Sequence, residues 1–110
     1  MSRTLTIATL LFLTGAAHAA AQDLAARGAQ VYTAQKCSVC HSIAGKGNAK
    51  GSLDAVGSKL SAADIRAWIT DAAGMTAKTN APRKPVMKNY ALPKDDMDAL
   101  VAYLSSLKKP

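Results

Sequence analysis

Residues 37–41 read Cys-Ser-Val-Cys-His, and this short stretch decides the interpretation of the chain. It has the form C-x-x-C-H, the attachment signature of c-type haem. The short turn between Cys37 and Cys40 matches the separation of the two vinyl groups on one side of a porphyrin, so both thiols can add to them. His41 then lies under the ring centre, where an imidazole nitrogen reaches the iron. The motif therefore predicts one covalently bound haem c with His41 as an axial ligand of its iron.

Three other interpretations of the two cysteines are weaker. A thioredoxin-like dithiol expects a preceding strand and a βαβ pattern, which the flanking sequence does not show. A zinc site needs a fourth ligand from Cys or His, and none remains if His18 leaves with an N-terminal signal. A disulfide across a two-residue gap would be strained and would constrain little of the chain.

The ligand on the other face of the iron decides what the haem does. If His18 leaves with the signal, a second histidine ligand is excluded and three methionines compete for the position. Met87 is favoured, because Pro85 stiffens its approach within a long loop and a helix follows that can hold this loop. Met75 directly follows an expected helix and is the alternative. Met97 lies on an apolar helix stripe, where core packing is the better interpretation.

The first 21 residues have the pattern of a cleavable secretory signal. Arg3 supplies the positive start, residues 5–13 form a mostly apolar run, and small residues favour cleavage after Ala19 or Ala21. The apolar run is shorter than the roughly 20 residues that a membrane span needs. We therefore expect a periplasmic protein exported by the Sec route, without a membrane span after cleavage and with one domain over residues 22–110.

The chain is strongly basic, with a formal net charge of +7, and its seven acidic residues are all aspartate. Nucleic acid is not an expected partner outside the cytoplasm. Six basic residues lie in two long loops: Lys46, Lys50, Lys59, Arg83, Lys84 and Lys88. If these loops wrap the haem, the residues form a basic rim that favours redox partners with acidic docking surfaces. The alternative is that the lysines only keep the protein soluble.

Three segments show apolar residues at helical spacing and are expected to form the three main helices of an all-α fold: residues 24–36, 62–73 and 93–107. Asp23 is a suitable N-cap for the first and Ser61 for the second. Gly74 is a natural stop for the second helix, and Pro93 suits the first position of the third.

The remaining segments, residues 42–60 and 75–92, are rich in Gly, Lys, Asn, Ser and Pro. Loops of this length are uncommon in a compact domain unless they serve a function, and wrapping a flat cofactor is such a function. A core of about 90 residues also often needs a disulfide, a metal or a cofactor for stability.

The order of these features, C-x-x-C-H first, Pro-x-Met later and a closing helix, resembles the class I monohaem cytochromes c over residues 22–110. In that family the N- and C-terminal helices cross, and a glycine lets them approach closely. Gly28 and Tyr32 match one side of that crossing, and Leu100 and Tyr103 match the other. The resemblance implies the cytochrome c fold, with long loops that wrap one haem.

Residues 51–53, Gly-Ser-Leu, look like the family's loop beside the ligand histidine. The resemblance implies that a backbone carbonyl of this loop accepts a hydrogen bond from the second ring nitrogen of His41, which would set its tautomer and ring orientation. Ser52 stands where the family often has proline, and Lys88 follows Met87 where the family often has another proline.

These observations predict a one-electron carrier with a His/Met-ligated haem. With both axial positions filled there is no open site for a substrate, so the chain is not expected to be an enzyme by itself. Two alternatives remain: a tightly bound cytochrome subunit of a larger oxidoreductase, and a haem enzyme or gas sensor with a labile sixth ligand. Trp68 either hydrogen-bonds a haem propionate, as a tryptophan does in some members, or packs in the core.

Overall fold

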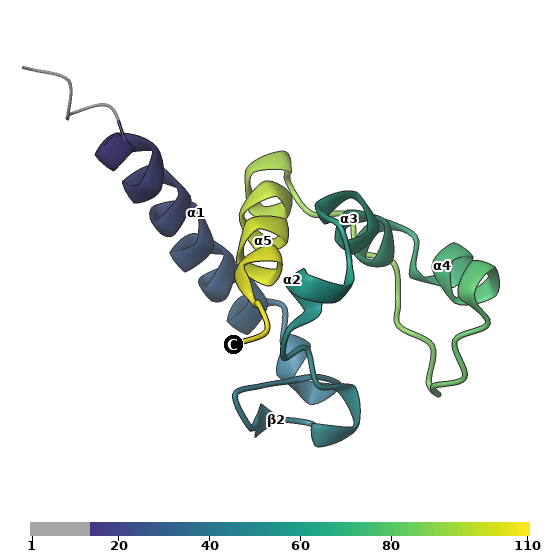
Figure 1. Ribbon diagram of the computed structural model, residues 1–110. Helices are drawn as coiled ribbons and strands as arrows, with labels where there is room; N and C mark the ends of the chain where they lie inside the picture. Colours follow the sequence, from purple (N-terminus) through teal and green to yellow (C-terminus); the bar gives the residue numbers. More distant parts are fainter. Residues whose placement is uncertain (1–13) are drawn as a thin grey trace, which may run out of the picture.

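The computed structural model describes residues 14–110, and this part of the chain is mostly helical (Figure 1). The apolar run of the expected signal, residues 5–13, lies outside the described residues. The elements in chain order, with η marking a 3-10 helix, are α1 (Thr14–Ala34), η1 (Cys37–Val39), β1 (Ser42–Ile43), β2 (Lys46–Gly47), η2 (Ala49–Gly51), α2 (Val56–Lys59), α3 (Ala62–Thr70), α4 (Ala72–Thr79) and α5 (Lys94–Ser106). Within the described residues the strands form a single short hairpin, so the expected all-α class is confirmed.

Helix α1 is longer at its N-terminal end than the sequence pattern predicts. A start at Leu24 behind an Asp23 cap is wrong, because α1 already begins at Thr14. Residues 16–21 are alanine except for one histidine, and alanine has the highest helix propensity, so no cap is needed at Asp23. The helix runs through both expected cleavage sites, and its residues 15–24 are exposed. Signal cleavage stays a prediction.

The second expected helix is divided in two. Helix α3 ends at Thr70, and Asp71 has a non-helical backbone with φ −142° and ψ 60°. The Asp71 carboxylate accepts a hydrogen bond of 3.1 Å from the N–H of Gly74 and so caps the start of α4. A single helix over residues 62–73 with a stop at Gly74 is therefore wrong, because a capping aspartate ends one helix and begins the next. Residues 75–79, expected in a loop, belong to α4.

The expected start of α3 and the extent of α5 agree with the structure. The Ser61 hydroxyl accepts a hydrogen bond of 3.1 Å from the N–H of Asp64, which confirms the N-cap. Helix α5 lies within one residue of its expected bounds at each end, although Pro93 is its N-cap residue and not its first helical residue.

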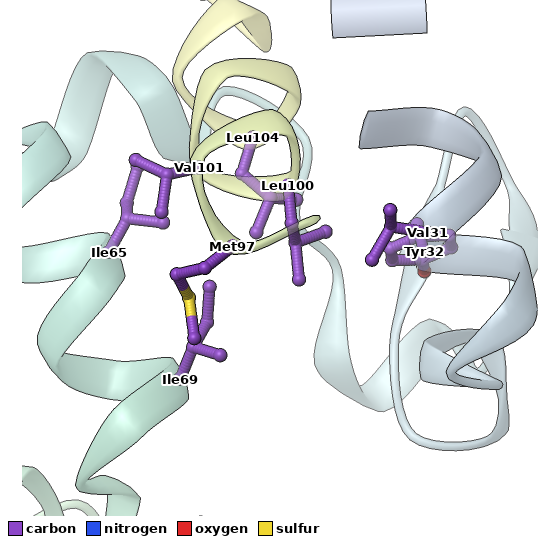
Figure 2. Packing of buried hydrophobic residues seen from close by; sticks show 8 residues of the cluster. All are labelled: Val31, Tyr32, Ile65, Ile69, Met97, Leu100, Val101 and Leu104. Atoms are coloured by element: carbon purple, nitrogen blue, oxygen red, sulfur yellow. The ribbon is translucent and has the colours of Figure 1, made fainter. Parts of the chain in front are cut away.

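The core is built around the apolar stripe of α5. Its four residues are all buried: Met97, Leu100, Val101 and Leu104. Figure 2 shows these side chains between two pairs from the neighbouring helices, Ile65 and Ile69 of α3 and Val31 and Tyr32 of α1. The three main helices α1, α3 and α5 thus build one core.

Gly28 lies where α1 crosses α5, and it is buried. A Cβ atom at this position would collide with the backbone carbonyl of Ala99 and with the side chain of Tyr103. Beside this contact the rings of Tyr32 and Tyr103 meet edge to face, with centroids 6.0 Å apart and planes at 72°. The expected close crossing of the N- and C-terminal helices is confirmed, and it explains a glycine in a helix interior.

The segment between η1 and α3 contains short elements, and part of it is attached to the C-terminal end of α5. In the hairpin, Ser42 lies opposite Gly47. The buried Gly57 of α2 donates its N–H to the carbonyl of Leu107 at 2.9 Å, and its own carbonyl accepts from the Lys108 ammonium at 2.7 Å. These bonds hold α2 beside the C-terminal end of α5.

Candidate haem-binding site

A cavity of about 680 Å³ opens between the C-terminal part of α1, η1, α3, α5 and residues 81–90. Its walls are mainly apolar and include many aliphatic side chains, among them Leu53, Leu60, Ile65, Ile69 and Leu100. Sites for small molecules and cofactors have volumes of about 300–1,000 Å³, so the cavity is large enough for a cofactor. The two long segments that the sequence assigned to wrapping a cofactor both contribute to its walls.

The C-x-x-C-H motif forms one rim of this cavity. After α1 ends, Lys36 takes a left-handed conformation (φ 55°), and the chain turns into η1. Cys37 is half-buried, Cys40 is exposed, and both thiols are free and line the cavity. Burial raises the pKa of the Cys37 thiol. The N–H of His41 donates to the carbonyl of Cys37 at 3.0 Å, so the turn brings all three motif residues to the same cavity.

His41 is oriented by a backbone carbonyl. Its Nδ1 lies 2.9 Å from the carbonyl oxygen of Gly51, which can only accept, so Nδ1 carries the proton and Nε2 keeps its lone pair. This is the contact that the resemblance implied for residues 51–53. Burial lowers the pKa of His41, and the nearby charge of Arg83 adds to the lowering, while the bond to Gly51 acts in the opposite direction. The imidazole is therefore neutral at pH 7, as a metal ligand must be.

The segment that supplies this carbonyl is held by its backbone. Ser52, in the place of a frequent proline, has φ −56°, which is within the range that proline itself adopts. The next residue, Leu53, donates its N–H to the carbonyl of Ser42 at 2.8 Å. The chain thus obtains a proline-like backbone at position 52 without a proline ring.

The three methionines differ in their relation to the cavity. Met87 lines it, together with Pro85 and Val86. Met97 is buried in the helix core, as the sequence pattern predicted, and Met75 lies in α4. Neither of these two is among the described residues that line the cavity. The structure therefore brings Met87, and not the other two, to the cavity that holds Cys37 and His41.

Two aromatic residues in the walls bear on the fit of a haem. Trp68 is half-buried, lines the cavity and is outside the buried cluster of the helix core. Tyr32 also lines the cavity. Its hydroxyl is buried and has no hydrogen-bond partner among residues 14–110. Two free thiols, an imidazole with one free nitrogen, a thioether and apolar walls are the donor set and surroundings that haem c requires. The residues present thus fit this cofactor.

The positive charges around the cavity differ from those expected. Of the six residues assigned to a basic rim, only Arg83 and Lys88 line the cavity. Lys36, which was not among these six residues, lines the cavity as well. Lys36 directly precedes the C-x-x-C-H motif, and this position in the sequence could have indicated that it lies beside the cavity.

The family model for cytochrome c matches residues 25–108. The chain therefore belongs to the cytochrome c family, and its fold is that of a cytochrome c. This membership implies haem c as the cofactor and electron transport as the function.

Cytochrome c oxidase subunit 2 of Alkalihalophilus pseudofirmus is 32% identical to this chain over 96 residues. The alignment covers 79% of this chain and 27% of that relative, so the chain spans about a quarter of the length of the curated relative it matches. No solved structure matches the chain. Among residues 14–110, no helix combines the length and the apolar character needed to cross a membrane.

Proposed function

We propose that this cytochrome c is a periplasmic one-electron carrier with one haem, attached through Cys37 and Cys40 and ligated by His41 and Met87. The observation that carries this proposal is the cavity itself. Its walls contain both thiols of the C-x-x-C-H motif, the histidine that follows them and one of the three methionines. These residues come from segments more than 40 positions apart in the sequence.

Each of these residues has a distinct role in the proposal. Cys37 and Cys40 hold the cofactor by thioether bonds, which keep it in place in an oxidising compartment. Gly51 fixes the imidazole of His41 so that Nε2 is the nitrogen offered to the metal. Bound haem supplies the one-electron couple of its iron. With His41 and Met87 on its two faces, no position remains for a substrate, which favours a carrier over an enzyme.

The compartment and the partners follow from the same residues. The secretory pattern of residues 1–21 supports export to the periplasm, and membership of the cytochrome c family is compatible with a location outside the cytoplasm. Val39 and Val86 line the cavity and are 68% and 38% exposed, and the cations Lys36 and Lys88 lie in the same walls. An apolar centre with basic residues around it suits a partner with an acidic rim, whose association rate would fall with added salt.

The identity of the sixth ligand tests the proposal. A thioether bound to ferric iron gives a weak near-infrared charge-transfer band. Met87→Ala in the haem-loaded protein should abolish this band, lower the reduction potential and let cyanide or carbon monoxide bind. Met97→Leu is the matched control and should keep the band, because a volume-conserving core substitution usually costs less than about 1.5 kcal/mol of stability.

Two outcomes would overturn parts of this assignment. If the unmodified protein lacks the band and binds carbon monoxide readily, it is an enzyme or a sensor and not a carrier. If the band survives Met87→Ala and disappears in Met75→Ala, the carrier function stands and only the residue is wrong.

A second candidate function is a cytochrome subunit bound permanently to a larger oxidoreductase. The similarity to an oxidase subunit 2 favours it, although the chain spans only a quarter of that relative. Sizing of the native protein from its source distinguishes the two functions. A free carrier elutes at the mass of one small chain, whereas a subunit elutes with its complex.

A further inference from the structure

Arg83 forms a hydrogen bond to the C-x-x-C-H turn. A surface cation that only attracts a redox partner would not need such a bond. Its guanidinium Nη2 donates a hydrogen bond of 2.5 Å to the backbone carbonyl of Cys40, 43 residues earlier in the chain. The guanidinium also lies against the Cα of Gly51, where an added Cβ would collide with it. Arg83 is partly buried, and within residues 14–110 no carboxylate forms an ion pair with it.

The segment that carries Arg83 has few other attachments. Residues 82–89 neither donate nor accept a backbone–backbone hydrogen bond among the described residues. The bonds at its ends run to α3 and α4: Ala81 donates to Thr76, and Tyr90 donates to Ile69 at 2.8 Å. The side chain of Asn89 also accepts from the N–H of Ala73 in α4. None of these bonds reaches the motif on the other side of the cavity.

We infer that Arg83 is a positioning residue. By binding the Cys40 carbonyl, it holds residues 82–89, the Met87 segment, closed over the cavity. Its side chain joins the segment with the proposed thioether ligand to the turn with the proposed histidine ligand. The planar guanidinium can touch the Cys40 carbonyl and the Gly51 backbone together, which the single ammonium of a lysine cannot do. This inference rests on the proposed function, because it concerns the same site.

The fixed positive charge of Arg83 has a second consequence. Ferric haem carries one more positive charge than ferrous haem, so a cation held beside the site disfavours the ferric state. Arg83 therefore raises the reduction potential.

The test uses the haem-loaded protein with three variants: Arg83→Met, Arg83→Lys and the control Lys84→Met. Lys84 is the exposed neighbour in the same segment, so its replacement removes the same charge without the bond to Cys40. Cyanide binds ferric iron only after Met87 leaves, so its binding rate reports how often the segment opens. A hydrogen bond to a charged group is strong enough that its loss in Arg83→Met should speed cyanide binding roughly tenfold or more.

The three variants should separate the bond from the charge. Arg83→Met should speed cyanide binding and lower the potential. Arg83→Lys should keep the potential near that of the unmodified protein and show an intermediate cyanide rate. Lys84→Met should change the cyanide rate less than twofold. If Arg83→Met does not fold, the cyanide-binding rate of Arg83→Lys is compared with that of the unmodified protein, and a faster rate in the variant supports the positioning role.

Equal cyanide rates in the Arg83 and Lys84 variants would overturn the inference, and Arg83 would then be an ordinary surface cation. This failure is distinct from a failure of the proposed function. The function fails if the near-infrared band is absent from the unmodified protein and carbon monoxide binds readily. A band that survives Met87→Ala overturns only the assignment of Met87 as the ligand. The positioning role fails if the unmodified protein shows the near-infrared band and the Arg83 variants bind cyanide no faster than it does.

Discussion

The helix crossing of α1 and α5 and the segment of residues 82–89 lie near the same cavity but are held in different ways. At the crossing, Gly28 lets two backbones touch, and the rings of Tyr32 and Tyr103 pack beside that contact. An ion pair of 3.0 Å between Arg27 and Asp96 joins the same two helices. The segment has no backbone–backbone hydrogen bonds among the described residues, and its Pro85, Val86 and Met87 line the cavity.

This difference separates what the chain stabilises by itself from what it leaves to the cofactor. The crossing is complete without any ligand, because its contacts are between side chains and backbone of the chain. The helices pack against a buried core, whereas residues 82–89 border a cavity. The order of this segment therefore depends on what fills the cavity and on Arg83. The described structure therefore combines a stable helix crossing with a locally weaker segment at residues 82–89.

The largest expected effect is on the crossing. Gly28→Val places a branched side chain against the carbonyl of Ala99, a backbone atom that cannot rotate away. Overpacking of this kind typically costs 1–3 kcal/mol, and we expect about 3 kcal/mol here because the neighbour is backbone. Denaturation by urea, followed by circular dichroism, measures the loss of the free energy of unfolding.

Gln30→Val is the matched control for this prediction. It introduces the same β-branched residue on the exposed side of α1, two positions away, and should change stability by less than about 1 kcal/mol. If the two variants are equally stable, α1 and α5 do not cross at Gly28 as closely as described.

An intermediate effect is expected in the rates of amide hydrogen exchange. Among residues 14–110, the backbone N–H groups of residues 83, 84 and 86–88 have no backbone acceptor, whereas those of Met97–Leu104 lie inside α5. In the haem-loaded protein the first group should exchange roughly a thousandfold faster or more, because it opens without global unfolding. Exchange followed by mass spectrometry of peptides resolves the two regions. Equal protection would mean that the segment and the helices open together.

The smallest effect is expected at the surface contact between α3 and α5. The carboxylate of Asp98 accepts hydrogen bonds of 2.6 Å from both Lys94 and Arg66, and these bonds lower the pKa of Asp98. Because the folded state favours the charged form, this contribution is present above the unfolded pKa of about 3.9 and is lost as pH falls through the lowered value. Asp98→Asn should therefore lower the thermal midpoint slightly at pH 7, since exposed pairs contribute little.

The pH dependence distinguishes this ion pair from a general effect of helix charge. The midpoint difference between Asp98→Asn and the unmodified protein should shrink as pH falls below about 4. Asp95→Asn is the control, because Asp95 lies in the same helix turn and has no ion-pair partner among residues 14–110. A difference for Asp98→Asn that stays constant down to pH 2 would exclude the ion pair as its cause.

The elements that the sequence predicted well are those encoded by neighbouring residues. The apolar stripe of α5 and the Ser61 cap depend on residues three or four positions apart, and both agree with the structure. The failures are at helix ends. Asp23 is a residue type that often caps helices, but here it lies inside the alanine-rich α1, which needs no cap at that position. Gly74 was expected to end the second helix, but Asp71 ends α3 and caps α4 instead.

The sequence by itself determined the chemistry of this protein: a C-x-x-C-H turn, a cytochrome c pattern and a glycine small enough for a helix crossing. These signals are local, because bond geometry and helix periodicity connect residues only a few positions apart. The sequence favoured Met87 as a ligand, and the family resemblance implied a backbone carbonyl of residues 51–53 beside His41. Only the tertiary structure decided that Met87 lines the cavity, that the carbonyl is that of Gly51 and that Arg83 reaches Cys40. Contacts across 10 to 43 positions depend on how the whole chain packs, and no periodicity in the sequence records them.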